Sequence, residues 1–138
     1  MILVDTGPLV ALLNRNDPLH SKAVGSFRGL RRCRMITTWP CLTEMQYFLG
    51  KVSGRSGQRT LERMIRMRHL EIRDLPSFES SGLEGLMDRY EDVPMDFADG
   101  SLVVLAEMSG CHRVITFDGH FFAYRLSDGT ALDVIIPY

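Results

Sequence analysis

The stretch Ile2-Leu3-Val4-Asp5-Thr6-Gly7-Pro8, at the start of the chain, decides the fold class. Its three aliphatic residues form a short apolar run, which is typical of a strand buried on both faces of a parallel sheet. Asp5 ends this run. Pro8 suits the first turn of a helix, because proline has a helical φ and its missing backbone N–H is not needed there. The stretch therefore predicts a buried strand that leads directly into a helix.

Strand and helix patterns alternate along the rest of the chain. Further strands are expected over residues 34–38, 70–75, 113–117 and 133–136. Further helices are expected over 17–29, 40–49, 59–69, 76–93 and 96–109, with a polar Gly/Ser loop over 51–57. This alternation predicts an α/β fold with three layers, in which helices flank a central, mainly parallel sheet. We expect residues 1–138 to form a single domain.

The charges are distributed unevenly, although the formal net charge is only −1. Residues 15–73 contain thirteen Lys and Arg and four Asp and Glu, whereas residues 74–138 contain three and twelve. Such a split is typical of a basic surface for a polyanion beside an acidic cluster for cations. Solvated helix faces that differ in sign by chance would produce the same split.

The cysteines and the apolar segments indicate where the protein works. The three cysteines have no CxxC pair and no Cys/His spacing suited to zinc, and their odd number favours reduced thiols. No cleavable leader precedes the first strand, and no apolar run approaches the roughly 20 residues of a membrane span. We therefore expect a soluble, cytoplasmic protein without a membrane partner.

Four acidic residues occupy positions where the pattern favours apolar ones. Asp5 and Asp118 each follow a predicted strand, and Glu44 and Asp99 lie on helix sides expected to face the sheet. Ligands of parallel sheets bind beyond the carboxyl ends of the strands. A buried carboxylate is costly unless it is paired or binds a metal, and hard cations such as Mg²⁺ prefer oxygen ligands. The four acids therefore indicate a cation site at this edge of the sheet.

Each acid also has a purely local explanation. Asp5 could cap the helix that follows it, and Asp118 could be a turn residue. Asp96 could be an N-cap with Asp99 in the first helical turn, and Glu44 could pair with an arginine. Taken together, these explanations require four coincidences.

Thr6 and Thr116 adjoin the acids that follow the strands. Their hydroxyls could orient a water or a phosphate, or they could serve only as capping or strand residues.

Four spaced segments carry a resemblance to a known family: residues 2–9, 42–44, 95–102 and 114–118. Together they resemble the PIN domain, and most closely the single-domain VapC-type toxins of toxin–antitoxin modules. The resemblance covers nearly the whole chain and depends on the order and spacing of the segments.

The resemblance implies specific roles for the acids. Asp5, Glu44, Asp99 and Asp118 match the four acidic catalytic positions of the family. Asp5 and Asp99 would be the main metal ligands, and Glu44 and Asp118 would complete the site directly or through water. Asp96 would be an auxiliary ligand, and which of Asp96 and Asp99 dominates stays open. Gly100 departs from the family pattern, because many relatives have alanine there.

The function implied by the resemblance is that of an endoribonuclease that uses Mg²⁺ or Mn²⁺ to hydrolyse RNA phosphodiester bonds. It also implies a toxin held by a protein antitoxin, and a homodimer. An RNA-processing nuclease outside such a system, or a non-catalytic module that binds a cation and RNA, stay open. A phosphatase with an aspartyl nucleophile would need a second Asp at position 7, which is Gly7. A receiver domain would need a late lysine, and none follows Lys51.

A basic stripe is expected on the helix predicted over residues 59–69 and the turn before it. Arg55, Arg59, Arg63 and Arg66 fall within about 80° of one another at 3.6 residues per turn. The stripe could follow an RNA backbone, contact an acidic segment of a partner, or be an ordinary solvated face.

Overall fold

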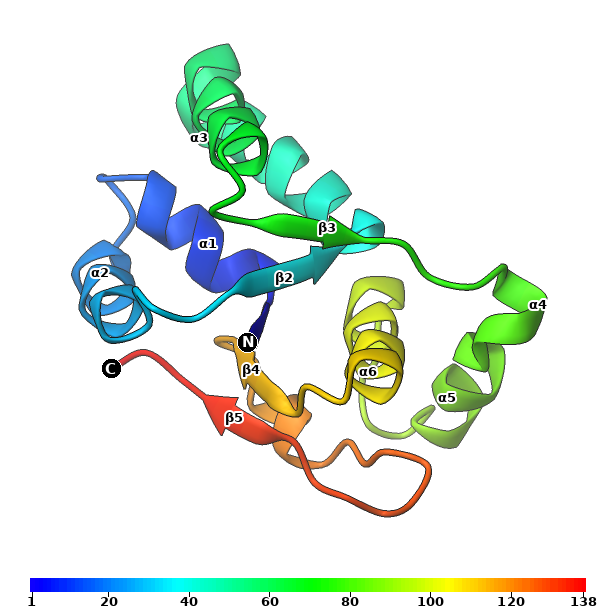
Figure 1. Ribbon diagram of the computed structural model, residues 1–138. Coiled ribbons are helices and arrows are strands. Elements are labelled where there is room, and N and C mark those ends of the chain that lie inside the picture. The colour runs from blue at the N-terminus through cyan, green and yellow to red at the C-terminus, as the bar shows by residue number, and fades with distance from the viewer.

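The computed structural model describes all residues, 1–138. Its five strands form one parallel sheet (Figure 1). Its order is β3-β2-β1-β4-β5, so that β1 lies in the centre. Leu3 on β1 is opposite Ile36 on β2 and Val114 on β4. The strands are β1 (Ile2–Val4), β2 (Met35–Thr38), β3 (Glu71–Arg73), β4 (Arg113–Ile115) and β5 (Asp133–Ile135).

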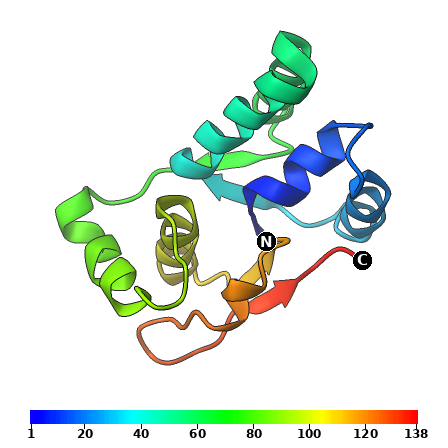
Figure 2. The ribbon, with the colours of Figure 1, turned by 180° about the vertical axis from the view of Figure 1, so that it is seen from behind.

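Helices flank this sheet on both sides. The pair α1 and α2 lies on one side and the pair α5 and α6 on the other, as both views of the ribbon show (Figures 1 and 2). The helices are α1 (Thr6–Leu13), α2 (His20–Gly29), α3 (Trp39–Arg66), α4 (Phe78–Ser81), α5 (Leu83–Arg89), α6 (Phe97–Ser109) and the short η1 (Gly119–Phe122). The predicted three-layer α/β class is confirmed. None of these helices is both long and apolar enough to cross a membrane.

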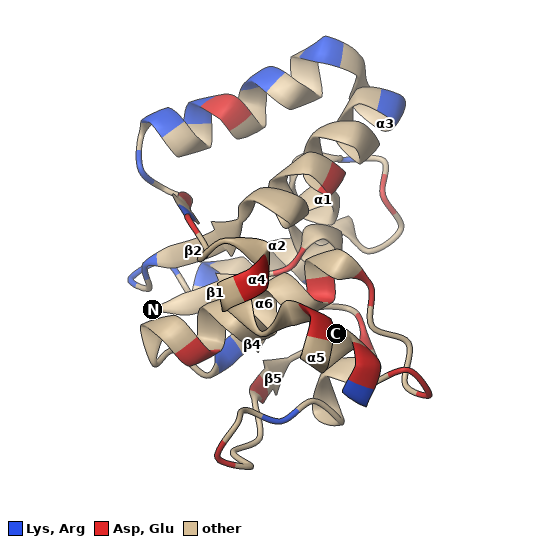
Figure 3. Ribbon diagram, turned by 90° about the vertical axis from the view of Figure 1, so that its right-hand side faces the viewer, with Lys and Arg blue, Asp and Glu red and all other residues tan.

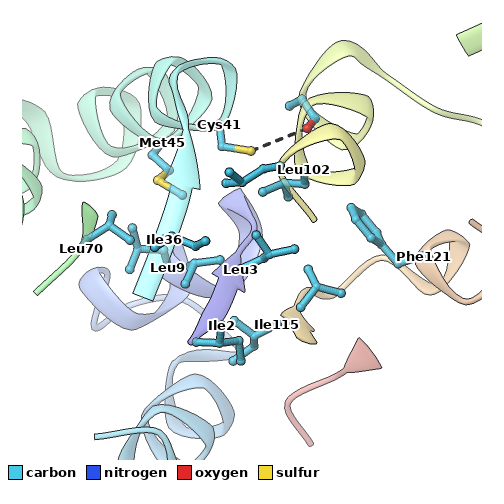
Figure 4. Close-up of a cluster of buried hydrophobic side chains, with 14 of the residues drawn as sticks. Ile2, Leu3, Leu9, Ile36, Cys41, Met45, Leu70, Leu102, Ile115 and Phe121 are labelled. Atoms are coloured by element: carbon cyan, nitrogen blue, oxygen red, sulfur yellow. Dashed lines mark hydrogen bonds between the residues drawn. The ribbon is translucent and has the colours of Figure 1, made fainter. Parts of the chain in front are cut away.

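The core is built around the central strand. All three residues of β1 are fully buried, and Leu9 of α1, Ile36 of β2 and Leu102 of α6 belong to the same cluster (Figure 4). Burying each such side chain stabilises the fold by roughly 1.5–3 kcal/mol. The core therefore fixes the end of β1, where Asp5 follows, relative to α1, β2 and α6.

Helix α3 differs from the prediction, which placed a loop over residues 51–57. These residues lie within α3, and only Gly54 leaves the helical region, with φ 62° and ψ −157°. The chain folds back there. The reversal brings the side chain of Gln58 to the backbone oxygen of Gln46, to which it donates at 3.0 Å. We call residues 39–53 the outgoing limb and residues 55–66 the returning limb. One glycine is enough for this reversal, since glycine tolerates positive φ.

The prediction of one continuous helix over residues 76–93 was also wrong. It is divided into α4 and α5 because Gly82 adopts a left-handed conformation with φ 73°. The strand predicted over residues 113–117 ends at Ile115, which leaves Thr116 and Asp118 beyond the carboxyl end of β4.

Candidate functional site

A hollow of about 500 Å³ opens beyond the carboxyl ends of β1 and β4. The starts of α1 and α6 and the outgoing limb of α3 complete its wall. No lysine, arginine or histidine lines it. Its acidic lining residues are Asp5, Asp17, Glu44, Asp96, Asp99 and Asp118. The structure thus brings the four acids singled out in the sequence to one place, although they come from four different segments.

Asp5 is held from both sides of its carboxylate. As the N-cap of α1, its Oδ1 accepts a hydrogen bond from the backbone N–H of Thr6 at 2.7 Å. Its Oδ2 accepts one from the hydroxyl of Thr116 at 2.6 Å, across 111 residues of sequence. The side chain is 8% exposed. Helix α1 and the end of β4 therefore fix the orientation of this carboxylate.

Asp96 and Asp99 form a capping box at the start of α6. Asp96 accepts from the backbone N–H of Asp99 at 2.7 Å, and Asp99 Oδ2 accepts from that of Asp96 at 3.1 Å. Gly100 follows them and is buried. A methyl group there would collide with Leu83 Cδ1 of α5. An alanine at position 100 would therefore require the Leu83 side chain to shift.

Glu44 and Asp118 are more exposed members of the lining. Glu44 Oε1 accepts a hydrogen bond from the hydroxyl of Thr6 at 2.8 Å, and no arginine forms a salt bridge with Glu44. Asp118 Oδ1 accepts from the backbone N–H of His120 at 2.8 Å and lies 2.7 Å from its Nδ1. The local explanations are therefore correct for Asp5 as a cap, for Asp96 and Asp99 at the start of α6, and for Asp118 in its turn, whereas Glu44 pairs with no arginine. They do not exclude a shared hollow.

The buried acids repel one another. Burial raises the pKa of Asp5 to about 6, and the charges of Glu44 and Asp96 add to the effect. Burial also raises the pKa of Asp99 to about 8, with contributions from the charges of Asp96, Asp5 and Asp118. The pKa of Glu44 is raised by burial and then by Asp96. Ionising these groups is costly because no cationic side chain lies among them.

A comparison with models of known protein families identifies the family of this chain. The family model described as "PIN domain" matches residues 2–125. The chain belongs to the PIN domain family. The resemblance seen in the sequence is thereby confirmed. No curated protein sequence matches this PIN domain.

Solved structures with the same fold include one that is described as a toxin. The Mycobacterium tuberculosis toxin VapC20, described as cleaving the sarcin-ricin loop, has a TM-score of 0.75 at 19% identity, covering 86% of this chain and 91% of its own. VapBC2 from Rickettsia felis, bound to a promoter DNA fragment, has a TM-score of 0.69 at 17% identity, covering 99% and 98%. FitAcB from Neisseria gonorrhoeae has a TM-score of 0.61 at 18% identity, covering 100% and 97%. At these identities the likeness concerns the fold.

Two threonines of this PIN domain have a role that the sequence analysis did not foresee. Their hydroxyls contact carboxylates: Thr116 donates to Asp5 and Thr6 donates to Glu44. Thr116 Oγ1 also accepts from the backbone N–H of Asp118 at 2.9 Å. Thr6 follows Asp5 and Thr116 lies two residues before Asp118, and this proximity was the available signal, although the hydroxyls donate to acids far away in sequence. Asp17 gave no such signal, because it reads only as the start of a helix.

The chemistry of the lining fits a hard divalent cation. The site offers carboxylate oxygens, the ligands that Mg²⁺ and Mn²⁺ prefer, and none of Asp5, Glu44, Asp96 and Asp99 forms a salt bridge. In this structure, however, no three of these side chains are arranged to hold a metal ion between them. Binding a cation would therefore require the carboxylates to move towards one another, which a bound positive charge favours.

Proposed function

We propose that this PIN domain is an endoribonuclease that uses Mg²⁺ or Mn²⁺ to hydrolyse phosphodiester bonds in RNA. The observation that carries the proposal is the gathering of acids in one hollow at the carboxyl ends of β1 and β4, with no lysine, arginine or histidine in its lining. Membership of a family whose members are typically nucleases supports the same conclusion.

In this proposal Asp5 and Asp99 are the main metal ligands, and Glu44 and Asp118 complete the site. A bound divalent cation lowers the pKa of a coordinated water and neutralises charge on the leaving oxygen. The chain itself orients the carboxylates, because Asp5 is fixed by Thr116 and Asp99 by the capping box with Asp96. No thiol lines the hollow, and burial raises the pKa of Cys41, a core residue of α3, to about 12.

The proposed biological role is that of the toxin in a toxin–antitoxin pair. Its support is the shared fold with VapC20, VapBC2 and FitAcB. The proposal includes a protein antitoxin as partner and a homodimer as the assembly. An antitoxin that inhibits this enzyme by covering the hollow would need cationic side chains to offset the acids.

Cleavage of RNA by the purified protein tests the proposed activity. We expect cleavage with Mg²⁺ or Mn²⁺ and none in EDTA. Asp5→Asn and Asp99→Asn should each lower the rate by more than about 100-fold, because each removes a ligand charge at little change in shape. Asp88→Asn, an exposed acid on α5, is the matched control and should cleave at the wild-type rate.

Two outcomes would contradict this activity. Cleavage that persists in EDTA would exclude metal dependence, and wild-type rates in both Asn variants would exclude the site. Expression in a bacterial host tests the toxin role separately. Growth arrest by the wild type, but not by Asp99→Asn, is expected, and co-expression of the neighbouring gene should relieve it. Normal growth alongside active cleavage in vitro would contradict only the toxin role.

A further inference from the structure

The returning limb of α3 carries a strongly basic, exposed face. Four arginines line a shallow polar hollow of about 480 Å³ together with Ser56, Thr60 and a single acid, Glu62. Figure 3 shows Lys and Arg recurring along this helix, away from the acidic segments near the end of the sheet. We call this surface the arginine face, and it consists of Arg55, Arg59, Arg63 and Arg66.

Contacts within the fold do not account for these arginines. Arg55 pairs with Glu62 at 2.9 Å, but Arg59, Arg63 and Arg66 form no salt bridge and no side-chain hydrogen bond. One acid, Glu62, lies among the four arginines, so the face keeps an excess of positive charge that no other side chain offsets. A binding role for an anion would explain this excess.

The arginine face and the acidic hollow belong to the same element. The outgoing limb contributes Glu44, Phe48 and Val52 to the hollow. The returning limb is tied to it by Gln58, which donates to the Gln46 backbone, and by a 3.4 Å hydrogen bond from the Gln46 side chain to Glu62. The hollow repels phosphates because its only charged lining residues are acids. A polyanionic substrate therefore needs positive charge nearby, and the same helical hairpin supplies it.

We propose that the arginine face binds the phosphate backbone of single-stranded RNA on its way to the acidic hollow. The proposal rests on the proposed ribonuclease function and names a binding surface for its substrate. Guanidinium groups suit this role because they are planar and donate two parallel hydrogen bonds to one phosphate. From Arg55 to Arg66 the helix rises by roughly 17 Å at 1.5 Å per residue, which gives room for several consecutive phosphates.

The test measures RNA binding without cleavage. The probe is a labelled 12-nucleotide single-stranded RNA, and its affinity is followed by fluorescence anisotropy in EDTA over a series of NaCl concentrations. The variant is Arg59→Gln/Arg63→Gln. The matched control is Arg31→Gln/Arg32→Gln, which removes two exposed arginines from the turn after α2 and changes the net charge equally.

We expect the Arg59/Arg63 variant to bind at least tenfold more weakly than the control at 0.1 M NaCl. The slope of log K against log salt should fall by about 1.4, because each lost contact to a single strand contributes about 0.7. The melting temperature should change little, since both arginines are exposed and form no salt bridge. Arg59→Lys/Arg63→Lys should recover most of the salt slope, because it keeps both charges.

Equal RNA affinities in the variant and the control would overturn the inference. Displacement of the RNA by polyglutamate at a lower concentration than by unlabelled RNA would also overturn it, in favour of an acidic protein partner. These failures differ from failure of the proposed function. Active cleavage with unchanged binding in the variant contradicts only the arginine face, whereas tight binding without cleavage in any metal contradicts only the ribonuclease.

Discussion

Replacing Asp5 by Asn should make the metal-free protein more stable. Asp5 is buried among acids, and its pKa is raised to about 6 from an ordinary value of 3.8, first by burial. Asparagine has nearly the same shape and no charge. Its side-chain oxygen can still accept from the Thr6 N–H, and its amide can donate to the Thr116 hydroxyl, so that the local geometry is kept.

The magnitude follows from the pKa shift. The rise from 3.8 to about 6 corresponds to about 3 kcal/mol at 1.36 kcal/mol per unit. Between these pH values the folded protein binds the proton more tightly than the unfolded chain, so stability falls as the pH rises, and the full cost is present above about pH 6. In the variant the Thr116 hydroxyl loses its acceptor, which costs about 1 kcal/mol. The expected net gain above pH 6 is therefore about 2 kcal/mol.

Thermal unfolding in EDTA, followed by circular dichroism, measures this gain. At pH 7.5 Asp5→Asn should melt roughly 6–10 °C above the wild type, and at pH 4 the advantage should vanish. The exposed Asp88→Asn should change neither value. Mg²⁺ or Mn²⁺ at 100 times its Kd should add about 2.7 kcal/mol to the wild type and much less to Asp5→Asn. A variant less stable than the wild type at pH 7.5 in EDTA would refute the reasoning.

Three further measurements address other parts of the site and fold. Thr116→Val should lower the unfolding free energy by about 1–3 kcal/mol and slow cleavage, because Asp5 loses its donor; unchanged denaturation midpoints and rates would exclude this role. Gly54→Ala should cost about 1–3 kcal/mol, whereas Gly25→Ala, exposed on α2 with open space around it, should gain about 0.5–1 kcal/mol; equal effects in chemical denaturation would contradict the strained reversal. Because the pKa of Asp99 is raised to about 8, cation binding near pH 7 should release protons and strengthen from pH 6 to 8; calorimetry in two buffers that shows no release would contradict it.

The parts of the fold predicted correctly are those that local patterns determine. The apolar run before Asp5 is long enough to identify a buried strand, and the alternation of strands and helices implies a parallel sheet. The carboxyl ends of parallel strands share one edge, so Asp5 and Asp118 could be assigned to the same edge of the sheet without knowing the strand order. The inward sides of the helices placed Glu44 and Asp99 in the same way.

The parts that were missed depend on contacts between distant residues. The polar composition around Gly54 is that of a loop, yet both limbs are helical up to this glycine and are joined by the hydrogen bond from Gln58 to the Gln46 backbone. Gly82 could end a helix or lie within one, and only the structure shows its positive φ. The hydrogen bond from Thr116 to Asp5 requires β1 and β4 to be neighbours, which no local pattern reveals.

The central position of β1 has a consequence for synthesis of the protein. Its two neighbours are β2 and β4, and β4 begins only at Arg113. At roughly 5–20 residues per second, a ribosome takes on the order of 5–20 s to pass from β1 to β4. During that interval the most apolar strand of the nascent chain has an open edge, which is a template for unwanted pairing with other chains. The acidic hollow needs both β1 and β4, so the newly made protein acquires its carboxylate cluster only after β4 has been synthesised.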